Sequence, residues 1–404
     1  MLQSRRATGC RHNSQKDESV LSLSLPSRPR VLFLISLTFF LAGCWADKPA
    51  APRAIADPPL PSVKIENPPT LPPELPVPAA VVVPPAPTSP VAPGVGPEAA
   101  AVPSAVPAAA VKPVAAKSGR LAGEDPEFAR KCGWPVACSE PLPGAILPAK
   151  RIVAYYGNPM SRRMGALGQY PKEEMLKRLK EEVNEWEKAD PKLPVQPALH
   201  LVAVVAQDIP GKSGKYRKIM DDDMVNMVYA WAKEEKALLF LDIQTGHEDI
   251  RTLLPRFEWI LKNPDVHLGI DPEFNLRTSL VVPGTKIGTY DAAEINFVTE
   301  FLQGLVQKYK LPPKVLTVHR FTQNGVTNAR KIVLRPEVQV VMHMDGWGGS
   351  WLKRTSYRDY VVAEPVQYTG FKIFYHNDTK KGDPLMAPAD LLRLNPQPLY
   401  IQYQ

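Results

Sequence analysis

The sequence predicts a (β/α)8 TIM-type barrel whose final helix is missing or replaced, preceded by a disordered Pro/Ala-rich linker. Three observations predict it: prolines crowd into one early stretch, apolar runs alternate with amphipathic stretches after Arg151, and polar residues end most of those runs. We divide the chain into a signal peptide (1–43), a lipidated cysteine with its linker (44–118), and a barrel domain (119–404). The last segment is close to the ~250 residues typical of such a barrel.

The N-terminus has the pattern of a bacterial lipoprotein signal. Arg28 and Arg30 precede the apolar run 31–41, which suits a secretory signal and is shorter than the ~20 residues of a membrane-spanning helix. Leu-Ala-Gly-Cys at 41–44 resembles the lipobox, at which Cys44 would receive a lipid. We expect a membrane anchor at Cys44, in the outer membrane if the organism has one, and a domain in the cell envelope outside the cytoplasm. The alternative is an ordinary secretory signal with a chance cysteine.

The segment that follows Cys44 has the composition of a spacer. Of the 45 prolines in the chain, 20 lie between Pro49 and Pro113. Proline removes backbone donors and is excluded from helix interiors and central strands, so this segment cannot form a packed core. Polyproline II rises ~3.1 Å per residue, which gives the linker a reach of up to roughly 200 Å.

Eight short runs rich in β-branched and aromatic residues predict the strands of the barrel. Because amphipathic stretches separate them, the strands are expected to be parallel and joined by helices. The runs are Ile152–Tyr156, Leu199–Ala206, Leu238–Ile243, Val266–Asp271, Val315–His319, Val338–Met344, Phe371–Tyr375 and Leu399–Tyr403.

The stretches between these runs are predicted helices. An apolar stripe from Leu176 to Trp186 follows the first run, and Asp291 with Glu294 forms a capping-box-like start to a stripe that ends at Tyr309. No eighth helix follows the last run, so residues 120–150 could cover that gap or close the barrel floor. The rival is an open doubly wound sheet, which the absence of a Gly-rich phosphate loop after the first run disfavours.

Charge and cysteine content exclude several classes of protein. The net charge is +8, but six basic residues lie in the first 30 positions, so the domain has no basic face that predicts nucleic-acid binding. Four cysteines are too few for a disulfide-stapled fold and too dispersed for a zinc ribbon. Cys132 and Cys138 could close a small disulfide loop in an oxidising compartment. We expect a monomer without a cofactor.

Polar residues at the ends of the runs predict a functional site, because a parallel barrel carries its catalytic groups at the carboxyl ends of its strands. These residues are Tyr155, Asp242, Gln244, Asp271, Glu273, His319, His343, Asp345, Tyr375 and Gln402. Each alone could be satisfied by a partner such as Arg320 or Lys372. Together they indicate a site, because burying carboxylates without a function is costly. His200 and His267 lie near the starts of their runs, so we interpret them as structural.

The acids suit glycoside hydrolysis. Side chains alternate along a strand, so Asp271 and Glu273 share a face, and a third acid, Asp345, lies across the barrel. One protonated acid and one charged group are what that reaction requires.

Two resemblances bear on this interpretation. Gly-Ile-Asp-Pro-Glu at 269–273 and Met-His-Met-Asp at 342–345 are similar to strand motifs of family 18 chitinases. That likeness implies Glu273 as general acid, Asp271 orienting a substrate acetamido group, and Asp345 supporting it. The earlier aspartates of the chitinase motif are absent, and strand eight lacks its tryptophan. A longer likeness, over FLDIQTG, HLGIDPEF, IGTYDAAEIN and LPPKVLTVHRF, is to secreted bacterial barrel lipoproteins without an assigned activity.

Aromatic residues near the run ends favour a carbohydrate ligand, because ring faces stack on sugar C–H faces. They include Tyr155, Tyr156, Phe274, Phe321, Trp347, Trp351 and Tyr375. We therefore predict a barrel that acts on a glycan or peptidoglycan through Glu273, Asp271 and Asp345, with the other run-end residues and Trp347 contacting the ligand. The alternatives are a non-catalytic glycan-binding lipoprotein and, less favoured, a metal-dependent hydrolase. The first run lacks the His-x-His of amidohydrolases.

Overall fold

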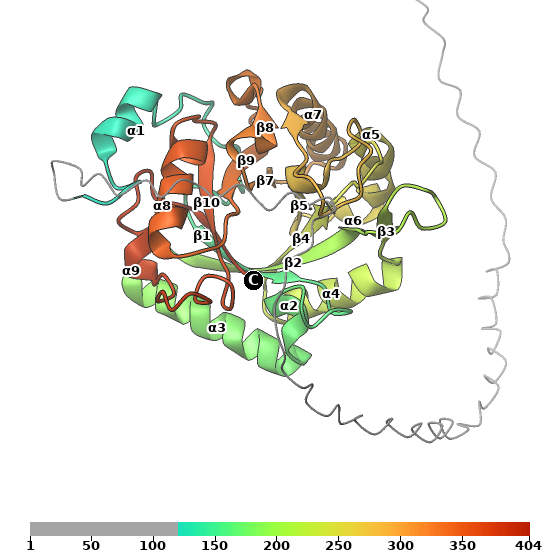
Figure 1. Cartoon of the computed structure of the whole chain (residues 1–404), viewed down its shortest axis with the longest axis horizontal. Coiled ribbons are helices and arrows are strands. Elements are labelled where there is room, and N and C mark those ends of the chain that lie inside the picture. The colour runs from blue at the N-terminus through green and yellow to red at the C-terminus, as the bar shows by residue number, and fades with distance from the viewer. Residues whose placement is uncertain (1–119) are drawn as a thin grey trace, which may run out of the picture. The chain divides into compact units, whose positions relative to one another are not determined.

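The computed structural model describes residues 120–404, which form a closed barrel of parallel strands with helices around it (Figure 1). The ring closes because β1 pairs in parallel with both β2 and β11. Its strands, in order around the ring, are β1 (Arg151–Gly157), β2 (Val195–Ala206), β4 (Leu238–Ile243), β5 (Val266–Ile270), β7 (Lys314–Arg320), β9 (Val338–Met344), β10 (Tyr368–Ile373) and β11 (Tyr400–Tyr403). Each predicted run corresponds to one of these strands, so the predicted barrel is confirmed and the open sheet is wrong.

Short strands extend the barrel at its rim. β3 (Arg217–Ile219) pairs antiparallel with the end of β2. β6 (Tyr290–Asp291) and β8 (Val326–Thr327) form a separate parallel pair.

The helices cover the outside of the ring. They are α1 (Pro126–Cys132), α2 (Ala166–Gln169), α3 (Lys172–Ala189), α4 (Asp222–Glu234), α5 (Ile250–Leu253), α6 (Glu258–Leu261), α7 (Ala292–Tyr309), α8 (Ser350–Ser356) with the π-helix Tyr357–Val362, and α9 (Pro388–Leu391). Short 3-10 turns lie at Leu254–Phe257, Pro272–Phe274, Gln323–Gly325 and Ala329–Lys331.

The predicted start of α7 is confirmed. Asp291 and Glu294 bond each other's backbone in a capping box, which satisfies donors that a helix start leaves free. The apolar stripe is buried from Ile295 to Leu305, but Tyr309 at the helix end is exposed and its hydroxyl bonds Glu258. Tyr309 is therefore not part of the core, because the stripe leaves the barrel surface in the last turn.

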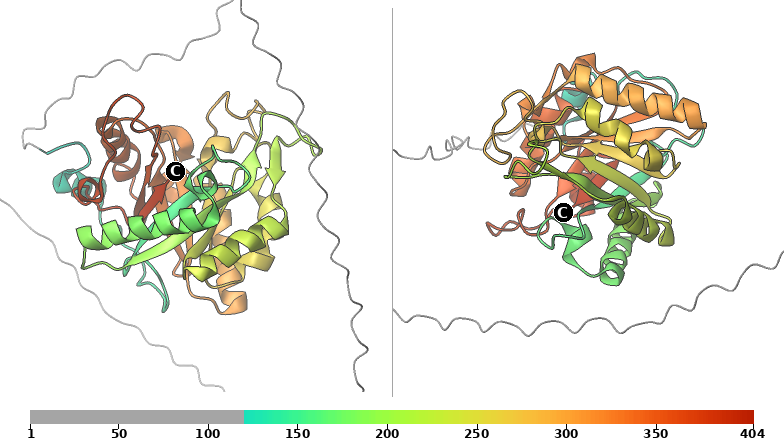
Figure 2. Two further views of the ribbon diagram at one scale, coloured as in Figure 1. Left: turned by 90° about the horizontal axis from the view of Figure 1, so that it is seen from below. Right: turned by 90° about the vertical axis from the view of Figure 1, so that its right-hand side faces the viewer.

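Two segments cover the barrel beside β11 and at its amino-terminal end. Helix α3 runs along the outside of the barrel (Figure 2), and its Trp186 indole donates a hydrogen bond of 2.9 Å to the Tyr403 hydroxyl of β11. At the amino-terminal end, Leu147 is buried among inward-facing residues such as Ile152 and Leu238. The Gln339 side chain fixes this segment by accepting from the Leu147 backbone at 3.1 Å. The segment before β1 therefore closes the barrel floor.

The predicted disulfide is not formed. Cys132 and Cys138 are both free thiols. Cys132 ends α1 and packs against the core, whereas Cys138 is exposed in the following loop. Among residues 120–404, no helix is both long and apolar enough to cross a membrane. The signal peptide, Cys44 and the linker lie outside the described residues.

Candidate functional site

A cavity of about 370 Å³ lies at the carboxyl ends of the barrel strands. Polar groups on its wall come from six different barrel strands or the loops after them, as the barrel fold predicts. They are Tyr156, Gln244, Asp271, Glu273, Asp345, Lys372, Asn377 and Gln404. The structure thus brings together the three acids that the sequence singled out as catalytic.

Glu273 is held over this cavity by a short turn. Strand β5 ends at Ile270, and the Asp271 carboxylate caps the turn Pro272–Phe274 by accepting from the Glu273 backbone N–H at 3.3 Å. No side chain of residues 120–404 forms a hydrogen bond or ion pair with the Glu273 carboxyl, because Lys372 and Arg320 are engaged elsewhere. Burial, and then the nearby charge of Asp345, raise the pKa of Glu273 to about 7. Glu273 is therefore able to hold a proton near neutral pH.

Asp345, in contrast to Glu273, is held in its ionised form. Its carboxylate lies 3.0 Å from Lys372 Nζ and 2.7 Å from His319 Nδ1, and all three side chains are buried. Burial alone would raise its pKa, but Lys372 and His319 outweigh burial and hold the pKa of Asp345 well below its usual range. Below about pH 7 the cavity wall therefore carries a protonated Glu273 beside an ionised Asp345.

Asp271 completes the group of acids. It is buried, and burial raises its pKa well above the ordinary value for an aspartate. Gln244 Nε2 lies 3.4 Å from Asp271 Oδ2 and 3.3 Å from the Tyr156 hydroxyl. Gln244 itself is fixed because its Oε1 accepts from the Ala206 N–H at 3.0 Å.

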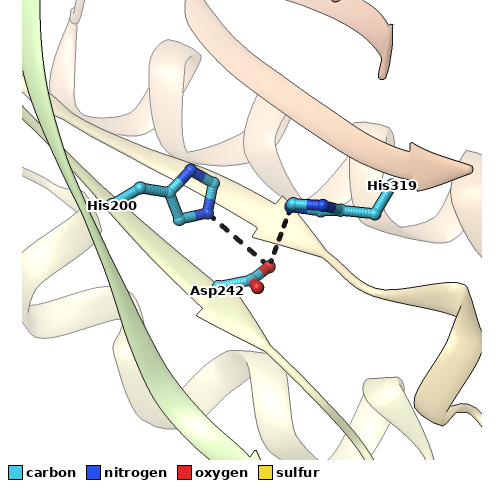
Figure 3. A group of neighbouring side chains, drawn as sticks. All are labelled: His200, Asp242 and His319. Atoms are coloured by element: carbon cyan, nitrogen blue, oxygen red, sulfur yellow. Dashed lines mark ion pairs between the residues drawn. The ribbon is translucent and has the colours of Figure 1, made fainter. Parts of the chain in front are cut away.

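A second polar layer lies inside the barrel, beneath the cavity. His200 Nε2 and His319 Nε2 both approach Asp242 Oδ1, each at 3.6 Å (Figure 3). All three side chains are fully buried, and these three atoms have no hydrogen-bond partner. The ligand-type atoms lie within 4.8 Å of one another, a spacing that a metal ion could bridge. The sequence interpretation of His200 as a structural residue near the start of its strand missed this group.

Several residues expected to contact a ligand lie in this lower layer instead. Asp242, His319, His343 and Gln402 are buried and none of them lines the cavity. The Gln402 amide bonds His200 Nδ1 at 2.9 Å. The prediction that these four side chains contact the ligand is therefore wrong. Each lies two residues too early on its strand, and so too deep in the barrel, to reach the mouth.

Tyr155 and Tyr375 lie outside the barrel. The Tyr155 hydroxyl is 3.0 Å from that of Tyr375, which in turn donates to Glu182 of α3 at 2.6 Å. Both rings pack edge or face against Tyr403. The prediction that they line the site is wrong, because on β1 it is the neighbouring Tyr156 whose side chain turns inward.

Aromatic side chains complete the mouth. Phe274, Phe321 and Phe374 line the cavity, and Trp347, which is 47% exposed, lines both it and a smaller adjacent hollow. Trp351 is 62% exposed beside that second hollow. An aromatic surface therefore leads from the open rim into the acid-lined cavity.

Two residues of the mouth have a larger part than the sequence indicates. Tyr156, which the sequence places only among the aromatic residues near the run ends, donates to Asp242 Oδ2 at 2.9 Å and so joins the cavity to the lower layer. Lys372, which the sequence offers only as a partner for an acid, lines the cavity, and its ammonium lies 3.9 Å from the centre of the Tyr156 ring. Strand alternation from Gly370 through Lys372 was the signal that could have placed it inward.

Fold and site together define a (β/α)8 barrel protein with an acid-lined mouth. Among solved structures, the chain is similar to a ruminal GH26 endo-beta-1,4-mannanase, at a TM-score of 0.29 and 10% sequence identity. The match covers 69% of this chain and 65% of that chain, so the chain spans just under two thirds of the neighbour's length. No protein family and no curated protein matches the sequence.

Proposed function

We propose that this barrel hydrolyses a glycosidic bond at its mouth, with Glu273 as the general acid. The observation that supports this is the pair of carboxyl groups on one cavity wall whose environments hold them in opposite charge states. Pairs of acids separated in this way are typical of acid–base catalysis on sugars. The Asp345 charge is fixed by its contacts with Lys372 and His319, so it also keeps the Glu273 proton in place.

In this proposal, Glu273 donates its proton to the glycosidic oxygen as the bond from that oxygen to the anomeric carbon breaks. The ionised Asp345 stabilises the positive charge that develops on the sugar ring. A water molecule then adds to the anomeric carbon and returns a proton to Glu273. Asp271 is a positioning residue, because it caps the turn that carries Glu273.

The aromatic surface supports an extended glycan as the substrate. Trp347 connects the cavity to the adjacent hollow, so a chain of sugars can stack along it while one linkage lies beside Glu273. We further propose that the chain is anchored through lipid on Cys44 and that the linker carries the barrel across the cell envelope. Peptidoglycan and environmental polysaccharides are then the glycans within reach.

The test is a screen of the purified full-length protein against peptidoglycan fragments and common polysaccharides. Glu273→Gln is expected to lower turnover at least a hundredfold while retaining binding, since general acid catalysis contributes about 10²–10⁴-fold. Glu300→Gln, which changes an exposed acid on α7, is the matched control and is expected to behave as wild type. Turnover should also decline as the pH rises through about 7, where Glu273 loses its proton.

Two results would change this conclusion. Turnover that survives unchanged in Glu273→Gln would refute the assignment of the acid. Binding without any turnover would favour the second candidate, a non-catalytic glycan-binding lipoprotein, which the exposed Trp347 and Trp351 also suit.

A further inference from the structure

The buried layer beneath the cavity contains three unpartnered ligand atoms that converge on one point. His200 Nε2, Asp242 Oδ1 and His319 Nε2 come from β2, β4 and β7, and the two nitrogens lie 3.6 Å from the same oxygen (Figure 3). Two ligands ~2.1 Å from a tetrahedral zinc ion are separated by roughly 3.4 Å. The two nitrogen–oxygen separations are therefore close to those of a metal site.

The other polar atoms of these three residues are already engaged. His319 Nδ1 lies 2.7 Å from Asp345 Oδ2, His200 Nδ1 lies 2.5 Å from the Tyr400 hydroxyl, and Asp242 Oδ2 accepts from Tyr156. The carboxylate behind His319 is an arrangement that orients metal-binding imidazoles and leaves Nε2 free for the ion, whereas His200 Nδ1 faces the Tyr400 hydroxyl and the Gln402 amide. The three free atoms are thus the ones that a metal ion would bind. Because burying a polar atom without a partner is unfavourable, a bound ion would also explain why these atoms have no hydrogen bonds.

A glycine keeps space beside these atoms. At Gly269 of β5, an added Cβ would lie 2.5 Å from His200 Nε2 and 2.7 Å from Asp242 Oδ1. The backbone there has no left-handed conformation that would itself demand glycine. Glycine at this position is therefore explained by the close approach of the two ligand side chains, which a Cβ would displace.

We infer that His200, Asp242 and His319 bind a divalent transition-metal ion, with zinc as the best match to two imidazoles and one carboxylate. The three side chains are buried and do not line the cavity, so we assign the ion a structural role. Through the bond from His319 to Asp345, it also fixes the ionised acid at the mouth. This inference does not depend on the proposed glycoside hydrolysis.

The experiment is metal analysis of the purified full-length protein, followed by chelation and titration with zinc, manganese and iron(II). We expect about one metal ion per chain, and a melting temperature that falls on chelation and recovers with zinc. Asp242→Asn is expected to weaken zinc binding by at least a hundredfold. Asp345→Asn, which removes the carboxylate behind His319, is expected to weaken it about 10- to 100-fold.

A pair of glycine variants separates the metal site from general crowding. Gly269→Ala places a methyl group against His200 and Asp242, whereas Gly370→Ala places one 2.4 Å from His343 Nδ1, elsewhere in the barrel interior. We expect Gly269→Ala to lose the metal and Gly370→Ala to retain it. Wild-type protein without stoichiometric metal and without a thermal response to any of the three ions would overturn the inference. Equal metal affinity in wild type and Asp242→Asn, or equal loss in both glycine variants, would also overturn it.

Discussion

Replacing Glu273 by glutamine is expected to stabilise the protein above neutral pH while removing the proposed activity. The carboxyl lies in the cavity wall without a bonding partner among residues 120–404, and the charge of Asp345 faces it. Ionising Glu273 in the folded protein is therefore unfavourable. A neutral amide of nearly the same shape removes that penalty without creating a cavity.

The magnitude follows from the shift in pKa. Glu273 has a pKa of about 7 in the folded protein against an ordinary value of 4.5. Below pH 4.5 the group is protonated in both states and contributes nothing. As the pH rises from 4.5 to about 7, only the unfolded chain ionises, so the folded state loses stability relative to it. At ~1.4 kcal/mol per pKa unit, the loss amounts to roughly 3 kcal/mol and is complete above neutral pH.

Denaturant unfolding of wild type and Glu273→Gln on both sides of this pH window measures the effect. Subtracting the two curves removes the contributions of groups whose titration the two proteins share. The variant should gain about 3 kcal/mol relative to wild type between the two conditions, and Glu300→Gln should show no such gain. A difference that does not change with pH would refute the raised pKa and, with it, the reason for assigning Glu273 as the acid.

Three further variants test other parts of the structure. Lys372→Met leaves Asp345 buried with one partner fewer and is expected to lower the free energy of unfolding by about 3–5 kcal/mol. Adding Asp345→Asn should restore part of that free energy, and no recovery would argue against the ion pair. Leu147→Ala should cost about 2–5 kcal/mol, because Leu147 fills the barrel floor, and an unchanged melting curve would contradict that packing. Trp347→Ala should weaken glycan binding about tenfold by calorimetry, with a smaller loss in Trp351→Ala, which lies outside the mouth cavity; equal losses would place the binding surface elsewhere.

The fold could be predicted because buried parallel strands are nearly continuous apolar runs, and each of the eight runs corresponds to a barrel strand. The same property made inward faces hard to predict. On β1, Tyr155 and Tyr156 are adjacent and equally aromatic, so the sequence offered no contrast between the two faces. On β5, by contrast, apolar residues alternate with Gly269 and Asp271, and the predicted inward face of Asp271 is what the structure shows.

The sequence also did not show how deep each inward side chain lies along the barrel axis. Asp242, His319 and His343 were expected at the rim because each lies near the end of a strand. The rim position depends on how far each strand is staggered against its neighbours, and that stagger follows from strand tilt and ring closure. The register places His319 opposite His343 and Asp242 opposite Gly269, so these positions form a common lower layer.

The two layers are related by strand alternation. Positions two residues apart on a strand share the inner face, and a step of two positions leads from the buried layer to the mouth. Examples are Asp242 and Gln244 at the end of β4, and His343 and Asp345 at the end of β9. Asp345 bonds Lys372 at the mouth and His319 below, so the ionised acid that faces Glu273 is positioned from beneath. A rearrangement of His319 would remove one of the two contacts that hold the Asp345 carboxylate and leave the contact with Lys372. The pKa of Glu273 therefore depends on burial, on Asp345 and Lys372 in the cavity wall, and on His319 in the layer below, which does not line the cavity.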